Sequence, residues 1–142
     1  MVINALLPLF VGSFCLTICL AGCSNAPVRD RLQVAALVSH GLLRAEQGNE
    51  RAAIADYSEA LRLQPANAQA LYLRGAAHDR QGNRTGALAD YSEALRHHPD
   101  LLPALVARAA LLTAMDNPVA AAVDLAAVRR LAGDDQPRPR AQ

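Results

Sequence analysis

The feature that most constrains this chain is an internal repeat with a period of 34 residues. Residues 34–67 align without a gap onto residues 68–101, and the segment ADYSEALR at residues 55–62 recurs unchanged at residues 89–96. A third, more diverged copy follows at the same period over about residues 102–135. A repeat of this length is typical of proteins in which each copy forms one supersecondary unit that stacks on the next.

Each copy predicts two helices joined by a tight turn. In the second copy we expect helices over about residues 67–80 and 84–97, with Gly82 ending the first in the left-handed conformation and Pro99 limiting the second. In the third copy the glycine turn is replaced by Asp116-Asn117-Pro118. These residues can also form a turn, because asparagine tolerates the left-handed conformation and proline fits a first helical turn. No alternating β-branched runs occur after residue 24, so the folded part is predicted to be all-α.

The most regular positions of the repeat alternate small and large side chains. In the first copy they are Leu37, Gly41, Ala53, Tyr57, Ala60 and Pro65. In the second copy they are Leu71, Gly75, Ala87, Tyr91, Ala94 and Pro99. The third copy keeps Leu105 and Ala121, but it has Ala109, Leu125, Val128 and Gly133 at the other positions.

A 34-residue helical hairpin with this pattern resembles the tetratricopeptide repeat (TPR) over about residues 34–133. The resemblance implies an all-α solenoid of three antiparallel hairpins, at about residues 34–67, 68–101 and 102–135, wound as a short right-handed superhelix. It also implies a groove for a protein ligand, lined by the first helix of each hairpin. The groove residues that we predict are Val38, Leu42, Gln69, Tyr72, Leu73, Ala76, Asp79, Val106 and Ala110.

The side chains of this groove are mostly small and apolar, with Tyr72 as the one large anchor. It lacks the Lys, Arg and Asn side chains with which some TPR domains hold the acidic C-termini of chaperones. Because aromatic anchors dominate many interfaces, we expect the ligand to be a partly apolar helix or extended segment of another protein.

Two charged positions also recur at the repeat period. One is occupied by His40, Arg74 and Arg108, and the other by Asp56, Asp90 and Asp124. Stacked hairpins would bring each arginine near an aspartate, and such partly buried ion pairs specify register more than they add stability. We therefore interpret these positions as structural, together with Tyr57 and Tyr91.

The N-terminal residues predict a membrane address. Residues 5–20 are apolar, and Leu20-Ala21-Gly22-Cys23 at their end resembles the lipobox of bacterial lipoprotein signal peptides. The resemblance implies a leader of residues 1–22, cleavage before Cys23 and a diacylglyceryl group on the Cys23 thiol; Ser24 implies the outer membrane. No Lys or Arg precedes the run, which is long enough to span a bilayer, so an uncleaved transmembrane anchor is the alternative.

The remaining segments are predicted to lack a packed structure or to end the stack. We expect a tether over residues 23–33 and a disordered tail over residues 134–142. Ala122 and Arg129 replace the large apolar residues of the earlier copies, which predicts that the third hairpin ends the solenoid. Val119, Val123 and Ala126 would then stay exposed, and self-association through them is a further hypothesis.

Several classes of function find no support in the sequence. A net charge of +1 and 4% aromatic residues give no nucleic-acid footprint. Cys15 and Cys19 lie in the leader, so Cys23 alone would remain, without disulfides or a cysteine metal site. No nucleotide-binding or hydrolase motif occurs, and His40, His78, His97 and His98 lack metal-ligand spacing. We therefore predict no enzymatic activity, cofactor, metal or small-molecule substrate.

Together these features predict a cell-envelope lipoprotein that acts as a protein-interaction scaffold or adaptor. Its partner would be an unknown envelope protein, and its membrane contact the lipid on Cys23. The alternative is an assembly factor, either pilotin-like or for a pilus or secretion system. A subunit of a wall-enzyme complex is a less favoured alternative. A cytosolic TPR adaptor with a misassigned N-terminus is a third hypothesis.

Overall fold

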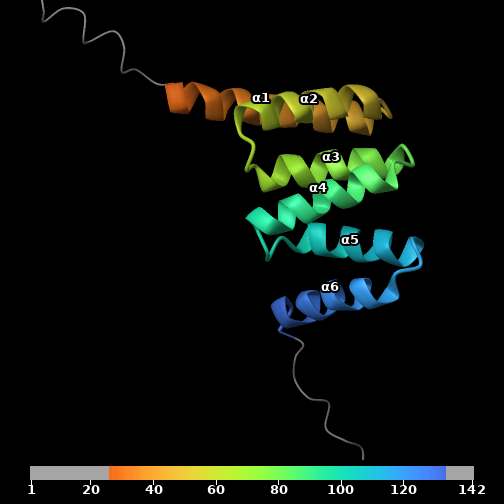
Figure 1. The fold of residues 1–142 in the computed structure, drawn as a ribbon. Helices are drawn as coiled ribbons and strands as arrows, with labels where there is room; N and C mark the ends of the chain where they lie inside the picture. Colours follow the sequence, from red (N-terminus) through yellow and green to blue (C-terminus); the bar gives the residue numbers. More distant parts are fainter. Residues whose placement is uncertain (1–25, 134–142) are drawn as a thin grey trace, which may run out of the picture.

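The computed structural model describes residues 26–133, and every regular element in that range is a helix. The six helices are α1 Ala26–Glu46, α2 Glu50–Leu63, α3 Ala68–Arg80, α4 Arg84–His97, α5 Leu102–Ala114 and α6 Pro118–Leu131. Successive helices pair as three antiparallel hairpins, which stack into one column from α1 to α6 (Figure 1). The predicted all-α fold of three antiparallel hairpins is confirmed for residues 26–133.

The three turns inside the hairpins share one capping device. Asn49, Asn83 and Asn117 recur at the repeat period, and each side chain accepts a hydrogen bond from the backbone N–H three residues later. This bond satisfies one of the free N–H groups at the start of α2, α4 and α6. The second helix of every hairpin therefore begins at the same repeat position.

The residue before each asparagine has a positive φ. Gly48 and Gly82 have φ of 75° and 78°, and Asp116 takes the same place in the third turn with φ of 57°. Our sequence interpretation assigned the left-handed conformation of this turn to Asn117, which instead has φ of −116°. Asn117 caps α6, so the left-handed residue must precede it.

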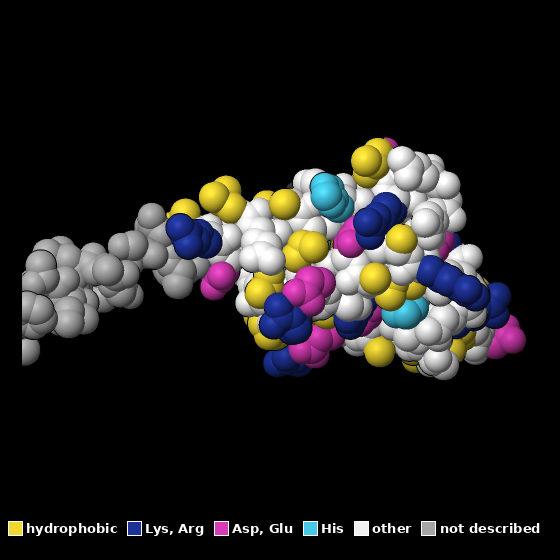
Figure 2. Space-filling view, turned by 90° about the horizontal axis from the view of Figure 1, so that it is seen from above, with side chains coloured by type: hydrophobic (Ala, Val, Ile, Leu, Met, Phe, Trp, Pro, Cys, Tyr) yellow, Lys and Arg dark blue, Asp and Glu magenta, His cyan; other side chains and the backbone are white. Residues whose placement is uncertain are grey.

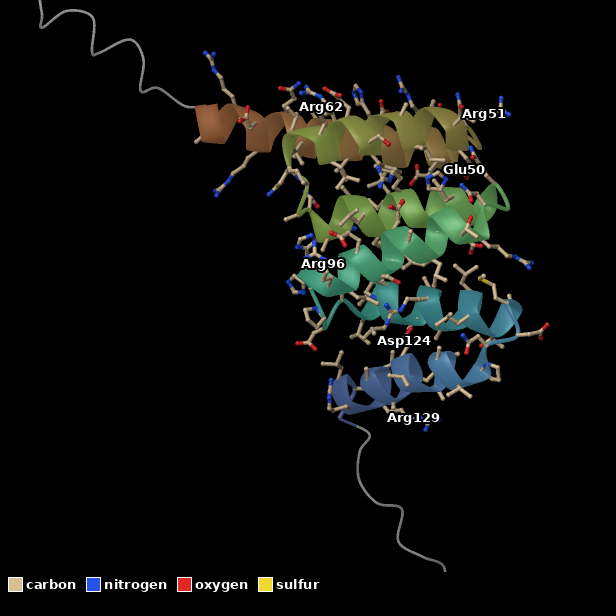
Figure 3. All side chains as sticks on the ribbon, viewed as in Figure 1. Glu50, Arg51, Arg62, Arg96, Asp124 and Arg129 are labelled. Atoms are coloured by element: carbon tan, nitrogen blue, oxygen red, sulfur yellow. The ribbon has the colours of Figure 1, made fainter. Side chains whose placement is uncertain are left out.

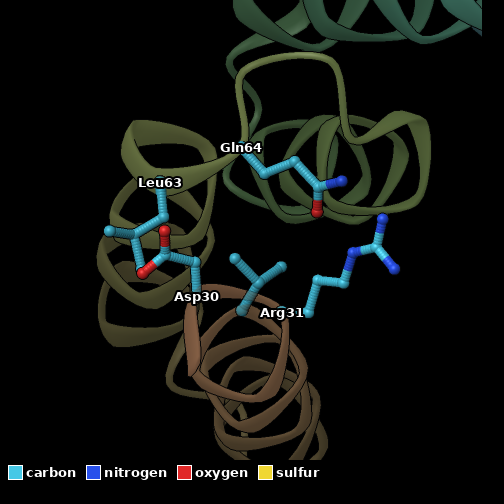
Figure 4. A pocket seen from close by; sticks show the side chains of 5 residues that line it. Asp30, Arg31, Leu63 and Gln64 are labelled. Carbon is cyan, nitrogen blue, oxygen red and sulfur yellow. The ribbon is translucent and has the colours of Figure 1, made fainter. Parts of the chain in front are cut away.

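The first helix is longer than predicted. α1 begins at Ala26, so residues 26–33 of the predicted tether are helical. Pro27 lies in the first turn, where its missing N–H breaks no helical hydrogen bond. Asp30 and Arg31 of this extension face Leu63 and Gln64 at the end of α2 across a pocket of about 160 Å³ (Figure 4). The predicted tail and leader lie outside the described residues.

The core runs along the column and repeats with the sequence. Its main cluster comprises Val34, Ala60, Leu61, Ala70, Leu71, Ala94, Leu95, Ala104 and Leu105. All four of its alanines are fully buried, so neighbouring helices approach closely at these points. Leucines fill the space beside them, which gives each junction between hairpins the same pattern of small and large side chains.

Glycine and tyrosine set the spacing within the hairpins. A Cβ atom on Gly75 would lie 2.8 Å from Cε1 of Tyr91, and one on Gly41 would overlap the ring of Tyr57. Tyr57 and Tyr91 are the largest fully buried side chains. Each ring therefore occupies the space that a side chain on the facing glycine would need.

The first helices of the hairpins lie on the inner side of the stack. α3 contacts both α1 and α5, whereas α2, α4 and α6 make no comparable contact with one another within residues 26–133. The inner surface is therefore formed by α1, α3 and α5, as the TPR resemblance implied. Among the described helices, none combines the length and apolarity that crossing a membrane requires.

Candidate functional site

The predicted groove residues all reach the surface of α1, α3 and α5. None of the nine is fully buried. The partly buried ones are Val38, Tyr72, Leu73 and Ala76. The exposed ones are Leu42, Gln69, Asp79, Val106 and Ala110.

Four of these residues meet in one concavity, which we call the Tyr72 pocket. It has a volume of about 190 Å³ and lies between α1 and α3 with Tyr57 of α2 behind it. Its lining residues are Leu42, Ala45, Glu46, Tyr57, Tyr72, Leu73, Ala76 and Arg80. Its volume exceeds that of a single large apolar side chain.

The other five predicted groove residues lie outside this pocket. Val38 packs instead against the main core cluster. Val106 is 49% exposed on α5, away from the α1–α3 concavity. Gln69, Asp79 and Ala110 are exposed but do not line the pocket. The structure thus concentrates the concave part of the predicted groove between the first two hairpins.

The pocket contains two charged residues that our sequence interpretation did not select. Glu46 and Arg80 end α1 and α3 and are separated by one repeat of 34 residues. The repeat alignment therefore places them at equivalent positions, from which they could have been selected. Nη1 of Arg80 lies 3.3 Å from Oε1 of Glu50, which lies between the first and second hairpins (Figure 3). The side chain of Arg80 is 59% exposed, so its charge lies at the mouth of the pocket.

Two tyrosines, Tyr57 and Tyr72, line the pocket, and Tyr91 packs beside Tyr72 outside it. The ring centroids of Tyr72 and Tyr91 lie 6.0 Å apart with an interplanar angle of 33°, within the range of favourable aromatic pairs. Burial raises the pKa of Tyr57. Burial, and secondarily the charge of Asp79, raises the pKa of Tyr91 to about 12. Both buried phenols therefore stay neutral at physiological pH.

The charged positions of the second and third hairpins form a ladder of ion pairs. Nε and Nη2 of Arg74 donate to the two carboxylate oxygens of Asp90 at 2.8 and 2.6 Å, and Arg108 binds Asp124 at the same distances. The hydrogen bond to Asp90 raises the pKa of Arg74 above its ordinary value. Figure 3 shows Asp124 directed between the helices, whereas Arg129 lies on the outer surface of α6.

The same arginines also join successive hairpins. Nη1 of Arg74 donates to Oγ of Ser58 in the preceding hairpin at 3.3 Å, and Nη1 of Arg108 donates to Oγ of Ser92 in the same way. Asp90 and Asp124 are 6% and 3% exposed. This geometry favours the interpretation of these residues as structural.

The first hairpin lacks this arrangement. His40 stands at the arginine position and is exposed, so Asp56 accepts a hydrogen bond from Nη1 of Arg44 at 2.7 Å instead. Oδ2 of Asp56 is buried without a hydrogen-bond partner. Arg44 lies one helical turn from His40, which is close enough for a long side chain to take its place.

The far end of the stack exposes apolar side chains. Val119 and Val123 on α6 are 78% and 67% exposed. Ala122 and Arg129, which replace larger apolar residues, are also exposed. Residues 26–133 contain no cluster of three His, Cys, Asp or Glu side chains arranged to hold a metal ion.

Comparisons with known proteins match this architecture. A family model described as TPR repeat matches residues 41–82, and one described as tetratricopeptide repeat matches residues 68–101. No curated protein sequence matches the chain.

Solved structures share the fold at low sequence identity. The first TPR of Spaghetti (RPAP3) bound to the HSP90 peptide SRMEEVD has a TM-score of 0.69 and 22% identity over 73% of this chain and 85% of that chain. The Arabidopsis OM64 TPR domain has a TM-score of 0.70 and 20% identity over 75% and 88% of the two chains. A Thermobaculum terrenum O-GlcNAc transferase mutant has a TM-score of 0.69 and 24% identity over 75% of this chain and 21% of that chain.

The matched repeats and the structural neighbours lead to one conclusion about the architecture. The fold of residues 26–133 is an all-α TPR solenoid, and residues 41–101 carry the TPR repeats that the family models match.

Proposed function

We propose that this protein is a cell-envelope lipoprotein that holds a partner protein in the Tyr72 pocket. The observation that carries the proposal is the concavity between α1 and α3, where Leu42, Tyr72 and Ala76 form an apolar part beside Glu46 and Arg80. Nothing in the sequence suggests catalysis, so the proposed role is that of a scaffold or adaptor. The proposed anchor is a lipid on Cys23, and the proposed location is the outer membrane because Ser24 resembles an outer-membrane address.

The pocket chemistry favours an apolar anchor residue on the partner. Its floor is aliphatic and aromatic, and a volume of about 190 Å³ accommodates a leucine- or phenylalanine-sized side chain. Burying such a side chain contributes about 1.5–3 kcal/mol. Arg80 carries a positive charge and Glu46 a negative one. The pocket therefore offers no strong preference for a charged segment.

This chemistry differs from that of the peptide in two structural neighbours. The TPRs of Spaghetti (RPAP3) are bound to the peptide SRMEEVD, which carries three acidic residues counting its aspartate. In the present chain the one arginine of the pocket is paired with Glu50. We therefore propose a partly apolar helix or extended segment as the ligand.

The anchoring part of the proposal is tested by the intact mass of the protein extracted from host membranes. A mass of residues 23–142 plus a diacylglyceryl group, with or without a third acyl chain, is the expected result. The mass of the uncut chain would replace the lipid with a transmembrane anchor. It would leave the proposal for the pocket standing.

The binding part is tested by photo-cross-linking in cells from a probe at position 73. We expect Ala76→Arg to abolish the cross-linked partner, because the guanidinium would fill the apolar concavity. Ala122→Arg on the exposed surface of α6 is the matched control and should leave the cross-link unchanged. A secretin or pilus subunit as the partner would identify an assembly factor, and a wall hydrolase a wall-enzyme subunit. A cross-link that survives Ala76→Arg would contradict the assignment of the site.

A further inference from the structure

The first helix exposes a face that its counterparts bury. Ala70 and Ala77 of α3, and Ala104 and Leu111 of α5, are at most 3% exposed because each helix packs on the preceding hairpin. The equivalent residues of α1 are Ala36 and Leu43. No hairpin precedes α1 in the described part of the chain, and Leu43 is 54% exposed.

The N-terminal extension of α1 continues this face. Val28 and Leu32 are 51% and 67% exposed. Together with Ala36 and Leu43 they follow the spacing of one side of a helix, and we call these four residues the free α1 face. α1 has 21 residues and is therefore about 31 Å long. Figure 2 looks onto this end of the stack and shows apolar side chains along α1, with a basic side chain near its start.

We propose that the free α1 face lies on the surface of the membrane to which the protein is anchored, a proposal that rests on the membrane attachment proposed above. The position of α1 along the chain supports this occupant. Only two residues lie between Cys23 and Ala26, so three steps of the chain give a reach of about 10 Å. With an uncleaved anchor the apolar run ends at residue 20, which gives a reach of about 20 Å. Either attachment keeps the start of α1 close to the lipid.

The charges beside the free α1 face fit a bilayer surface. Arg29 and Arg31 are both exposed at its membrane-proximal end; Arg29 lies next to Val28, and Arg31, next to Leu32, also lines the pocket at Gln64. Apolar side chains that enter the headgroup region beside arginines that bind anionic headgroups are typical of interfacial helices. Asp30 between them leaves a net positive charge on this turn.

A second copy of the chain fits the face less well. Head-to-tail stacking would place α6 of one copy against α1 of the next. Arg129 would then occupy the position at which Leu61 and Leu95 are buried. Ala126 and His40 would replace the serine and arginine that link the hairpins of this chain. Such a junction would bury a charge and lose the inter-hairpin hydrogen bond, so the membrane is the better occupant.

The experiment uses the natural absence of tryptophan from the chain. Leu32→Trp, Leu43→Trp and, as the matched control, Val119→Trp each introduce a single fluorophore at an exposed apolar position. The full chain, purified with its own anchor, is reconstituted into vesicles of phosphatidylcholine and phosphatidylglycerol with or without brominated acyl chains. We expect the brominated lipid to remove roughly half of the emission at positions 32 and 43 and to leave position 119 unchanged, because an interfacial helix enters the boundary of the acyl chains.

The outcomes separate this proposal from the one on which it rests. A chain that floats with the vesicles but shows no quenching at positions 32 and 43 overturns the lipid contact alone. A chain that does not float overturns both the contact and the anchoring. Emission that shifts with protein concentration, and not with brominated lipid, identifies a second copy on the face and also overturns the proposal. Arg29→Gln with Arg31→Gln should weaken quenching at position 32 without reducing flotation.

Discussion

A single guanidinium joins side chains from two hairpins at each inner junction of the stack. Arg74 binds both oxygens of Asp90 in its own hairpin and Ser58 in the preceding one. The aspartate is buried, so compensation of its charge depends mainly on the arginine, with Nε2 of His78 at 4.0 Å. Removing only the arginine would leave an unpaired charge in the core, which is far more costly than the pair is stabilising.

We therefore expect Arg74→Met to lower the free energy of unfolding by about 2–4 kcal/mol. The lower values apply because the Arg74 side chain is 25% exposed, so that water screens part of the interaction. The control is Arg96→Met, which breaks an exposed pair with Glu93 and should leave the free energy of unfolding nearly unchanged. Urea titrations followed by circular dichroism measure both. Equal losses in the two variants would show that burial of Asp90 does not govern the effect.

The buried phenols predict a loss of stability at high pH. The pKa of Tyr91 is about 12 in the folded chain and near 10 when unfolded, so the folded state holds this proton more tightly. Its contribution is complete below pH 10 and is lost as the pH rises toward 12, by an amount on the order of 2 kcal/mol. Denaturant midpoints measured from pH 9 to 12 should fall less steeply in Tyr91→Phe. An unchanged slope in that variant would exclude Tyr91 as the cause.

At the scale of the helices, capping and proline residues in the sequence predicted where a helix begins and ends, and tertiary contacts did not alter those ends. The helix expected over residues 84–97 has those bounds because Asn83 and the Pro99 segment act on their own neighbours. The extension of α1 was missed because it has no counterpart in the other repeats. Arg44 was missed because its contact with Asp56 exists only where His40 interrupts the ladder.

The Tyr72 pocket could also be predicted only in part from the sequence. The repeat alignment placed Leu42 and Tyr72 on one surface, but the depth of the concavity depends on how far α1 lies from α3. That distance follows from packing across the hairpin junction, where Ala77 and Ile54 lie in one cluster around Tyr57. No single helix carries this information in its own periodicity, so Glu46 and Arg80 were not selected from the sequence.

The third turn offers a test at the same scale. Asp116 has a positive φ at the place where the other turns have glycine, and a side chain there raises the energy of the backbone. We expect Asp116→Gly to stabilise the chain by about 0.5–1 kcal/mol, and the reverse change Gly82→Asp to destabilise it by a similar amount. Thermal unfolding measures both. A destabilised Asp116→Gly variant would mean that the aspartate makes a compensating interaction.

At the scale of the whole molecule, stability is distributed unevenly along the column. α4 buries five of its residues, whereas α6 buries only Ala121 and Asp124. α6 also packs on only one other helix in the described part of the chain. In a stack whose repeats contact only their neighbours, each end is stabilised by one junction instead of two. α6, which packs on α5 alone, is therefore the least supported helix of residues 26–133.

Hydrogen exchange should resolve this gradient. We expect the amides of α6 to exchange first and those of α3 and α4 last, because local opening needs less free energy at the weakly packed end. Asn117→Ala, which removes the cap of α6, should accelerate exchange in α6 by a factor of about 5 and leave α3 unchanged. Uniform exchange along the chain would instead indicate a single cooperative unit.

The link from Arg74 to Ser58 has a consequence for the length of the protein. The middle repeat, residues 68–101, supplies Arg74 to the hairpin before it and Ser92 to the hairpin after it. Extra copies of this segment, inserted in tandem, would meet one another with complete hydrogen bonds, while His40 and Ala126 would still stand at the two ends. The solenoid can therefore be lengthened in steps of 34 residues while the hydrogen bonds between successive hairpins are kept.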